Sequence, residues 1–273
     1  MTTLAFIGGG NMARALISGL IARGTDPRCI HVAEPMESTR YSLAAEFGVS
    51  VHRDSHEAAR DADIIVLAVK PQVMATVCRD LADQVAARNP LLISIAAGIR
   101  LQNFYSWFKP GARIVRCMPN TPALVGAGVT GLFADARVDA SARSRAEAIM
   151  AAAGATVWID DEALMDAVTA VSGSGPAYFF LLMESLIAAA ERQGLTPAAA
   201  RTLVLNTALG AARMAIADGS DDPAILRQRV TSPGGTTQAA LERLEAGGFR
   251  DLVDVAVVRA TERGRELSNQ FGA

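Results

Sequence analysis

The residue types that most often carry proton or metal chemistry are confined to the first half of the chain. The only lysines are Lys70 and Lys109, the last histidine is His56 and the last cysteine is Cys117. Beyond that point, chemistry must rest on backbone groups, hydroxyls, tyrosine, arginine or carboxylates. This inventory favours ligand binding through the main-chain dipoles of helix N-termini over catalysis by a strong side-chain acid or base.

A first glycine-rich turn follows the apolar segment Leu4–Ile7 and precedes a helical pattern. Its spacing, Gly-x-Gly-x-x-Ala, leaves free N–H groups at the positive end of a helix, where a pyrophosphate binds. Gly8 allows the tight turn, Gly10 lets the backbone approach the phosphates, and Ala13 allows close strand–helix packing. We therefore predict a nucleotide site here. The alternative is a strand–helix turn without a ligand.

A second turn, Ser232–Thr237, opens an apolar helix in the half that lacks lysine. A capping hydroxyl at Ser232, a proline, two glycines and two threonines describe a helix N-terminus with uncovered N–H groups. Such a terminus binds a carboxylate without a basic side chain. The alternative is an ordinarily capped helix.

A third stretch of small residues, Val171–Tyr178, is predicted to be a turn before a helix. It is either a corner where backbones pack closely or a wall against which a small ligand lies. The second interpretation places Ser174 beside the substrate.

Two charged residues bear on the choice of nucleotide. Glu34 ends the second expected strand, 24 residues past Gly10. An acidic residue there hydrogen-bonds the adenosine ribose and rejects a 2′-phosphate, which favours NADH. Arg40 is close in sequence and would favour the phosphate if it folded back. The sequence leaves NADH against NADPH open, together with the possibility that Glu34 is only a surface carboxylate.

No metal site is expected. His31, His52 and His56 have no carboxylate or cysteine at ligand spacing, and the three cysteines lie far apart in apolar settings. We interpret the cysteines as buried, reduced thiols of a cytoplasmic protein. The net charge of −2, the absence of a basic run and the 5% aromatic content argue against a nucleic-acid partner.

Apolar strand runs alternate with helices up to about residue 160, which predicts an α/β domain with a parallel sheet and right-handed crossovers. Ligands of such sheets lie beyond the carboxyl ends of the strands. The glycine turn, Lys70-Pro71, Ala96-Ala97 and Met118–Pro122 should therefore converge on one crevice. The expected strands are Leu4–Ile7, Cys29–Ala33, Asp63–Val69, Leu91–Ile95, Arg113–Met118, Gly128–Phe133 and Thr156–Ile159, and the expected helices include 12–23, 37–47 and 140–153.

Residues 161–273 are predicted to form a second, all-helical domain of five or six helices, after a first domain over residues 1–160. Helix starts are indicated at Thr196-Pro197, Asp222-Pro223 and Ser232-Pro233. The segment Ala177–Arg192 is apolar over most of its circumference and so needs cover on every side. We expect a homo-oligomer to supply this cover. The alternative is a central helix of a monomeric core. The most apolar stretch, Ala177–Ala190, is interrupted by Glu184 and is too short for a bilayer span, so no membrane association is expected.

Six strings in order along the chain resemble the pyrroline-5-carboxylate reductase family. They are Phe-Ile-Gly-Gly-Gly-Asn-Met-Ala (6–13), Ala-Val-Lys-Pro (68–71), Ser-Ile-Ala-Ala-Gly (94–98), Arg-Cys-Met-Pro-Asn-Thr-Pro (116–122), Ala-Val-Ser-Gly-Ser-Gly-Pro-Ala-Tyr (170–178) and Ser-Pro-Gly-Gly-Thr-Thr (232–237). The resemblance implies an N-terminal Rossmann-type parallel sheet, a C-terminal helical domain for substrate binding and dimerisation, and dimers assembled into a larger ring such as a decamer.

The resemblance also implies the site residues. The cofactor, NADPH or NADH, would be lined by Ile7, Gly8, Gly9, Gly10, Asn11, Met12, Ala68, Val69, Lys70, Pro71, Ile95, Ala96 and Ala97, with Glu34 at the ribose. The turn at Gly235, Thr236 and Thr237 would hold the substrate carboxylate, with the Thr237 hydroxyl near the ring nitrogen as the catalytic group. One departure is Glu34 itself, because other members carry a hydroxyl there and many use NADPH.

The reaction implied is hydride addition to the C=N bond of 1-pyrroline-5-carboxylate, the last step of proline biosynthesis. A cyclic imine takes up a proton more readily than a ketone, so the protein must mainly position the ring and hold its carboxylate. Three alternatives remain open: a β-hydroxyacid dehydrogenase, whose helical-half lysine this chain lacks, a reductase of another imine or keto substrate, and a nucleotide sensor without turnover. The role of Glu162, the ring size and any feedback regulation also stay open.

Overall fold

The computed structural model describes residues 2–217 and 221–271, and it divides into two compact units. The first, here called the sheet unit, comprises the chain up to Ser174 together with the residues from Arg259 onward. The second, the helical unit, comprises Gly175–Val258. This division does not fall at residue 160, where the sequence places a domain boundary. Residues beyond 160 still pack on the sheet: a Cβ added to Gly131 would lie 2.6 Å from Cγ1 of Val168.

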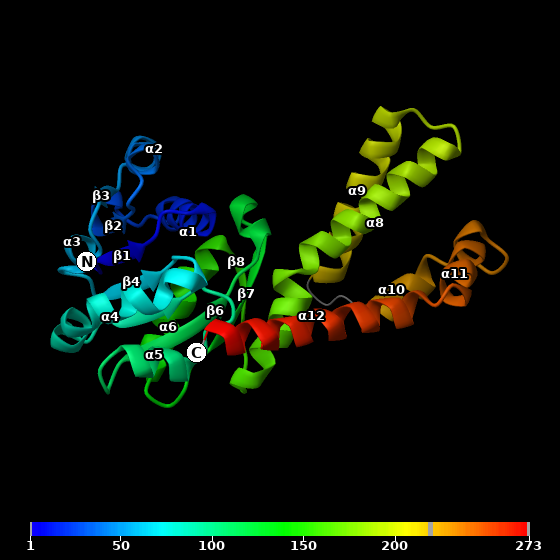
Figure 1. Ribbon diagram of the computed structural model, residues 1–273. Coiled ribbons are helices and arrows are strands. Elements are labelled where there is room, and N and C mark those ends of the chain that lie inside the picture. The colour runs from blue at the N-terminus through cyan, green and yellow to red at the C-terminus, as the bar shows by residue number, and fades with distance from the viewer. Residues whose placement is uncertain (1, 218–220, 272–273) are drawn as a thin grey trace. The chain divides into compact units, whose positions relative to one another are not determined.

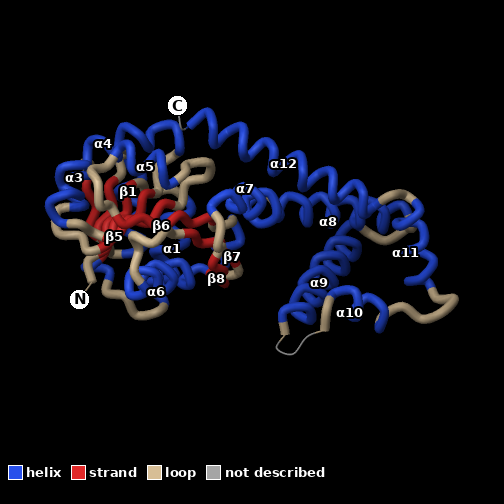
Figure 2. The backbone as a smooth tube through the Cα atoms, turned by 90° about the horizontal axis from the view of Figure 1, so that it is seen from below, coloured by secondary structure: helices blue, strands red, loops and turns tan. Residues whose placement is uncertain are grey.

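The sheet unit is built on eight strands in the order β3-β2-β1-β4-β5-β6-β7-β8 (Figures 1 and 2). β1 lies between β2 and β4, so the strand order reverses there and leaves a crevice at the carboxyl ends. The strands are β1 (Leu4–Ile7), β2 (Ile30–Ala33), β3 (Ser50–His52), β4 (Ile64–Leu67), β5 (Leu91–Ser94), β6 (Arg113–Met118), β7 (Gly128–Phe133) and β8 (Gly154–Trp158).

One strand pair departs from the predicted parallel sheet. β6 and β7 are antiparallel, with Cys117 opposite Leu132, whereas every other neighbouring pair is parallel. The link between them holds only the 3₁₀ turn η2 (Thr121–Val125). A parallel crossover needs a dozen or more residues, so a link this short turns the chain back on itself.

Helices cover both faces of the sheet, as the alternating pattern predicts. One apolar cluster includes Phe6 of β1 with Leu16 and Ile17 of α1 (Asn11–Ala22), and the other includes Ile7 with Met74 of α4 (Pro71–Arg88). Successive residues of β1 thus serve opposite faces, which explains its continuous apolar run. The remaining helices of this part are α2 (Glu37–Phe47), α3 (Ser55–Ala59), α5 (Leu101–Trp107) and α6 (Ala140–Met150), with 3₁₀ turns η1 (Pro27–Cys29), η3 (Ala151–Ala153) and η4 (Glu162–Leu164).

Six α-helices follow in the described residues after position 161, as expected. They are α7 (Met165–Val168), α8 (Gly175–Arg192), α9 (Pro197–Ile216), α10 (Pro223–Arg229), α11 (Thr236–Ala246) and α12 (Phe249–Phe271). Two predicted caps are confirmed: Thr196 Oγ1 accepts from Ala199 N at 3.3 Å, and Asp222 Oδ1 accepts from Ala224 N at 2.8 Å. The short elements β3 and α3, and the seven-residue helix α5, were not predicted.

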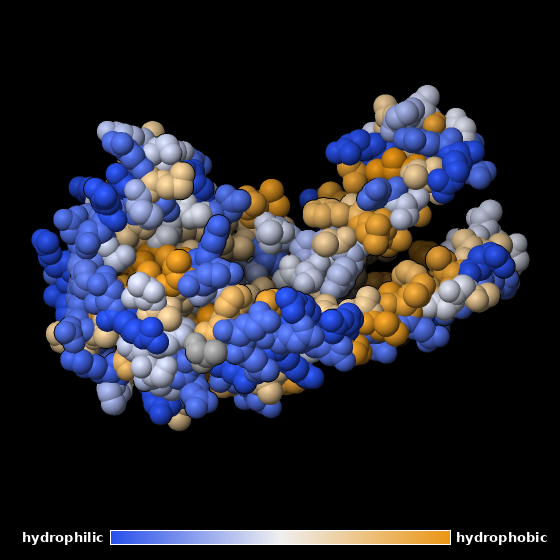
Figure 3. Space-filling view, viewed as in Figure 1, coloured by the Kyte–Doolittle hydropathy of each residue, from blue (hydrophilic) through white to orange (hydrophobic). Residues whose placement is uncertain are grey.

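The apolar circumference of α8 is largely uncovered within one chain. Phe179, Phe180 and Leu181 are each more than 60% exposed, and apolar surface continues over the helical unit (Figure 3). The helical run Glu162–Arg192 is 31 residues long, with 6% of its most apolar window buried. By length and composition alone this run would suit a bilayer span, because it extends well beyond the predicted apolar stretch Ala177–Ala190.

Candidate functional site

The residues predicted to line the dinucleotide lie along one edge of the sheet. The strand register places Ile7 beside both Ala33 and Leu67, and Leu67 beside Ser94. The segments that follow these strands are tied together by backbone hydrogen bonds. Gly8 N–H donates to Ala33 O at 2.8 Å, Ala68 N–H to Ile7 O at 2.8 Å, and Ile95 N–H to Leu67 O at 3.2 Å. Residues 7–12, 34, 68–71 and 95–97 therefore share the carboxyl edge. Met118–Pro122 follows β6, which is parallel to β5 and has Arg116 beside Ser94, so all four segments expected to converge lie at this edge.

The three glycines of the first turn differ in how closely neighbouring atoms approach them. Gly8 has a φ of +105°, and an added Cβ would lie 2.7 Å from the carbonyl oxygen of Ala68. A Cβ at Gly9 would lie 2.6 Å from Cδ1 of Leu43, whereas one at Gly10 would meet no atom within 4 Å. Gly10 is the N-cap of α1 and provides no side-chain cap. The first-turn N–H groups of α1 thus face an open approach.

Two groups of opposite charge, Glu34 and Arg40, lie just beyond the carboxyl end of β2. The Glu34 carboxylate accepts hydrogen bonds from Gly9 N at 3.1 Å and from Met36 N at 3.0 Å. The Arg40 guanidinium donates to the carbonyl oxygens of Glu34 (2.7 Å) and Pro35 (2.8 Å). Arg40 does fold back on the strand end, as one sequence alternative required. Both groups are therefore positioned where an adenosine ribose would lie in such a fold.

A further uncapped helix begins at the same edge. Lys70 is the N-cap of α4, its side chain gives no cap hydrogen bond, and Pro71 occupies the first helical position. Lys70 is exposed. Its ammonium is thus available beside the helix dipole for an anion at this edge.

The second predicted turn, in the helical unit, differs from expectation in detail. The helix begins at Thr236 with Gly235 as its N-cap, and the Ser232 hydroxyl does not cap it. Residues 232–235 form a turn closed by Gly235 N–H to Ser232 O at 3.0 Å. The predicted cap is wrong because Gly234, at φ +72°, ends the turn before the helix starts. Neither the cap nor an acidic first-turn residue covers this terminus.

The hydroxyl groups of this turn are unengaged. Among the described residues, the Thr236 and Thr237 side chains have no hydrogen-bond partner, and Thr237 is half-buried. Gln238 braces the turn, because its Oε1 accepts from Gly234 N at 2.7 Å and its Nε2 donates to Glu242 at 2.8 Å. The turn therefore presents N–H groups and hydroxyls with no competing internal anion at its start.

The stretch around Ser174 is helical rather than a turn. Residues Thr169–Gly173 form a π-helical segment between α7 and α8, and Ser174 N–H donates to Thr169 O at 2.8 Å. A Cβ at Gly173 would lie 2.5 Å from Cε of Met118. The glycine thus lies against the end of the flexible Met118 side chain, which is consistent with the close-packed alternative. π-Segments inside α-helices are frequent at functional sites.

Two motifs that the sequence could not connect meet here. Asn120 Nδ2 donates to the carbonyl oxygen of Ser172 at 3.3 Å and lies 3.4 Å from its hydroxyl, while Asn120 Oδ1 accepts from Val129 N at 2.9 Å. The loop after β6 is thereby fixed against the π-segment. Sequence reasoning noticed both strings but had no signal for their contact.

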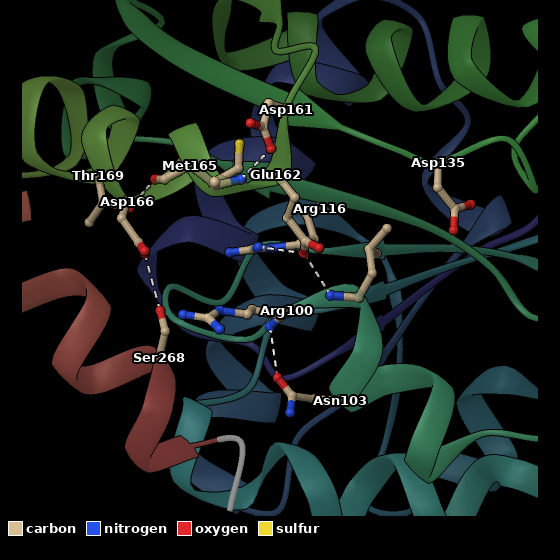
Figure 4. Close-up of polar contacts among 12 residues, drawn as sticks. Arg100, Asn103, Arg116, Asp135, Asp161, Glu162, Met165, Asp166, Thr169 and Ser268 are labelled. Carbon is tan, nitrogen blue, oxygen red and sulfur yellow. Dashed lines mark hydrogen bonds and ion pairs between the residues drawn. The ribbon is translucent and has the colours of Figure 1, made fainter.

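Glu162, whose role the sequence left open, has two partners in the sheet unit (Figure 4). Its Oε1 accepts from Arg116 at 2.6 Å and from the backbone N–H of Leu101 at 2.7 Å. The Arg116 side chain is 7% exposed, so its charge depends on this carboxylate for compensation. Glu162 thus joins β6 to the start of α5.

The histidines and cysteines form no metal site within the described residues. His31 Nδ1 lies 3.0 Å from His52 Nε2 on neighbouring strands. Burial, and then the nearby His52, lower the pKa of His31. Burial raises the pKa of the Cys78 thiol to about 12 and that of Cys117 further still, so both remain protonated thiols.

Comparison with known proteins agrees with this geometry. Residues 162–267 match the family model described as pyrroline-5-carboxylate reductase dimerisation, and residues 3–98 match that described as NADP oxidoreductase coenzyme F420-dependent. The chain is 48% identical to a pyrroline-5-carboxylate reductase of Pseudomonas aeruginosa, with 98% of both chains covered. It is 44% identical to one of Synechocystis, also over 98% of both.

Two solved structures resemble the whole fold. A pyrroline-5-carboxylate reductase from Coxiella burnetii has a TM-score of 0.94 at 44% identity, covering 97% of this chain and 98% of its own. A pyrroline carboxylate reductase from Plasmodium falciparum, solved with NADP bound, has a TM-score of 0.85 at 31% identity, covering 98% of each chain.

Proposed function

The chain belongs to the pyrroline-5-carboxylate reductase family, and we propose that it reduces the C=N bond of 1-pyrroline-5-carboxylate with NADPH or NADH, which yields L-proline. The reduced nicotinamide supplies the hydride when it is bound. The protein's own groups bind the two ligands, exclude water and orient the imine.

On the coenzyme side, the proposal rests on the uncapped N-terminus of α1. The first-turn N–H groups of α1, which no side-chain cap covers, would hold the pyrophosphate beside the Gly8–Gly10 turn. The N–H groups of Gly8 and Gly9 are already bonded to Ala33 and Glu34. Lys70 and the start of α4 add positive potential at the same edge. Residues 95–97, which follow the adjacent strand β5, would complete the lining on the nicotinamide side.

On the substrate side, the proposal rests on the N-terminus of α11. Its N–H groups and the Thr236 hydroxyl would hold the substrate carboxylate, and the Thr237 hydroxyl would hydrogen-bond the ring nitrogen. No lysine or histidine occurs in this part of the sequence, so no strong acid is available there. An imine that arrives protonated needs none, and this agreement between inventory and chemistry is the observation that carries the proposal. Ser174 is retained only as a candidate substrate contact beside the π-segment.

The test is an initial-rate assay with both coenzymes. Absorbance at the reduced-nicotinamide band should fall only when pyrroline-5-carboxylate is present, and proline should appear in equal amount. Coenzyme binding without any substrate-dependent oxidation would favour a nucleotide sensor. Oxidation with a keto acid and none with the imine would favour a dehydrogenase of another substrate.

The chain carries a dimerisation domain, and we propose a homodimer assembled further into a ring such as a decamer. A partner's helices would cover the exposed apolar faces of α8, which favours protein over lipid as their cover. The buried thiols of Cys78 and Cys117 suit the proposed cytoplasmic location. Native mass spectrometry would give the subunit number, and a monomer at micromolar concentration would contradict this assembly.

A further inference from the structure

The segment between β5 and α5, residues 95–101, contains three of the proposed coenzyme contacts but little that could hold it in place by itself. Ile95, Ala96 and Ala97 are followed by Gly98, which has a φ of +76°. At the strand end, Ile95 N–H donates to Leu67 O at 3.2 Å, and Ala96 N–H lies 3.4 Å from Ser94 Oγ. Alanine and glycine offer no long side chains to anchor the rest, so its position must come from elsewhere.

The last turn of α12 supplies contacts to this segment. A Cβ at Gly98 would lie 3.1 Å from Cδ2 of Phe271 and 3.6 Å from the backbone nitrogen of Ser268. Phe271 packs against the apolar cluster that contains Ile99 and Leu101. The Arg100 guanidinium donates to Asn269 Oδ1 at 3.2 Å. We call Ser268, Asn269 and Phe271 the C-terminal clamp.

The clamp is itself anchored within the sheet unit. The Ser268 hydroxyl donates to Asp166 Oδ1 at 3.1 Å, and both residues are buried (Figure 4). Gly264, one turn earlier in α12, allows close contact there, because its added Cβ would lie 3.5 Å from Cβ of Asp166. At the other end of the segment, Glu162 holds the Leu101 N–H. Residues distant in sequence thus fasten the segment from both sides.

We infer that the C-terminal clamp is a positioning element for the coenzyme, acting through residues 95–101. The inference rests on the proposed function, in which Ile95–Ala97 contact the nicotinamide side of the dinucleotide. Without the clamp the segment samples more conformations, and binding must then select the competent one. The apparent dissociation constant then equals the intrinsic constant divided by the fraction of molecules in the competent conformation, so coenzyme binds more weakly. Turnover of the bound complex changes little.

The experiment compares two clamp variants with matched controls. Phe271→Ala removes the packing on Gly98, and Asn269→Leu removes the acceptor of Arg100. Gln270→Ala changes an exposed neighbour for which the structure records no side-chain contact, and Asn269→Asp keeps an oxygen for Arg100. The readouts are NADPH dissociation constants by coenzyme fluorescence, KM and kcat for the coenzyme, thermal melting, and amide hydrogen exchange.

The two clamp variants should raise the dissociation constant and the KM for coenzyme about threefold to tenfold, with kcat within about twofold. Gln270→Ala and Asn269→Asp should match the unaltered protein. Amide exchange should quicken in 96–101 and stay unchanged in 8–13, which lies on the same edge outside the clamp's reach.

An unchanged dissociation constant in a folded Asn269→Leu protein, or a lowered melting temperature with no change in coenzyme affinity, would overturn the clamp. If Phe271→Ala does not fold, Asn269→Leu carries the test, because it alters one hydrogen bond to an exposed guanidinium. Coenzyme binding is measured without the imine, so a failed reductase assay would contradict the proposed substrate and leave the clamp result standing. Absence of coenzyme binding by the unaltered protein would contradict both.

Discussion

Two helices of this protein begin in the same way at two different places. α1 in the sheet unit and α11 in the helical unit each have a glycine N-cap, no side-chain cap and no acidic residue in the first turn. Three other helices are capped by side chains: Asp139 caps α6, Thr196 caps α9 and Asp222 caps α10. α2 and α4 have no side-chain cap either, but their N-caps are Met36 and Lys70 and not glycine. A cap satisfies N–H groups that a ligand would otherwise use, so the uncapped termini remain available.

The two turns differ in what holds them. Around α1, Gly8 and Gly9 are buried and pressed against Ala68 and Leu43 of neighbouring elements. Around α11, Gly234 has no atom within 4 Å of its added Cβ, and the turn is braced by Gln238 from its own helix. The first site is shaped by tertiary packing and suits a long, fixed ligand. The second is shaped locally, and its Thr236 side chain is exposed while that of Thr237 is half-buried.

Alanine substitution in the two turns should give the largest contrast. Gly8→Ala meets both an unfavourable φ and a backbone oxygen at 2.7 Å, so coenzyme affinity should fall about 100-fold or more and the melting temperature should drop. Gly234→Ala, with φ +72° in open space, should cost only about 1 kcal/mol of stability. Thermal melting and coenzyme titration check both. Equal effects at Gly8 and Gly234 would contradict the view that tertiary packing shapes the first turn and local contacts shape the second.

Loss of the Thr237 hydroxyl should affect turnover alone. Thr237→Ala is expected to lower kcat by about tenfold to 100-fold, because it removes a hydrogen bond proposed to act on the reacting ring. Thr237→Ser keeps the hydroxyl and should retain most of the activity. Steady-state rates with saturating coenzyme give the comparison. If all three proteins turn over equally, Thr237 has no part in the mechanism.

The preference for NADPH or NADH should change with substitutions just after β2 and not with substitutions in α11. Glu34→Ser removes the carboxylate that we propose to face the ribose, and it should shift the NADPH-to-NADH ratio of kcat/KM toward NADPH by about tenfold. Arg40→Ala should shift the ratio the other way. Initial rates with both coenzymes give the ratios. A Glu34→Ser ratio equal to that of the unaltered protein would show that this carboxylate does not face the ribose.

Proton titration near neutrality should give the smallest effect, and only in the sheet unit, since the sequence has no histidine after His56. Burial lowers the folded-state pKa of His31, so the unfolded chain binds a proton first as the pH falls. Its contribution to stability is present above the ordinary histidine pKa of about 6.5 and is lost as the pH falls below it. His31→Gln should reduce the pH dependence of the melting temperature between pH 5 and 7 by about 1 °C. An unaltered slope would exclude His31 as its source.

Much of the sheet unit could be predicted because its signals are local. Continuous apolar runs such as Ile64–Leu67 mark strands buried on both faces, and Pro71 and Gly48 mark where helices start and stop. The three-residue strand β3 was not predicted, because it is too short to show the alternation of apolar and polar residues that marks a strand. The strand β7 was predicted, but its antiparallel direction was not. Strand direction depends on the length of the preceding link and not on the strand's own residues.

For the glycine-rich turns, too, local features could be predicted from the sequence and non-local ones could not. The sequence indicated both glycine-rich helix starts, because glycine and proline punctuation is local. It misplaced the cap of α11 at Ser232. It also predicted a turn over Val171–Tyr178, where the structure has part of the π-segment Thr169–Gly173 and the start of α8. In both cases small residues predict a turn, whereas neighbouring hydrogen bonds decide where the helix begins.

The sequence by itself determined the α/β and helical division of the chain, the family, and the absence of lysine and histidine from the half that would hold the substrate. Only the tertiary structure decided that Gly173 meets Met118, that Glu162 compensates Arg116, and that Phe271 reaches Gly98. The physical reason is range. Composition, periodicity and caps are properties of a few adjacent residues, whereas these contacts join segments far apart along the chain and exist only once the sheet has ordered them.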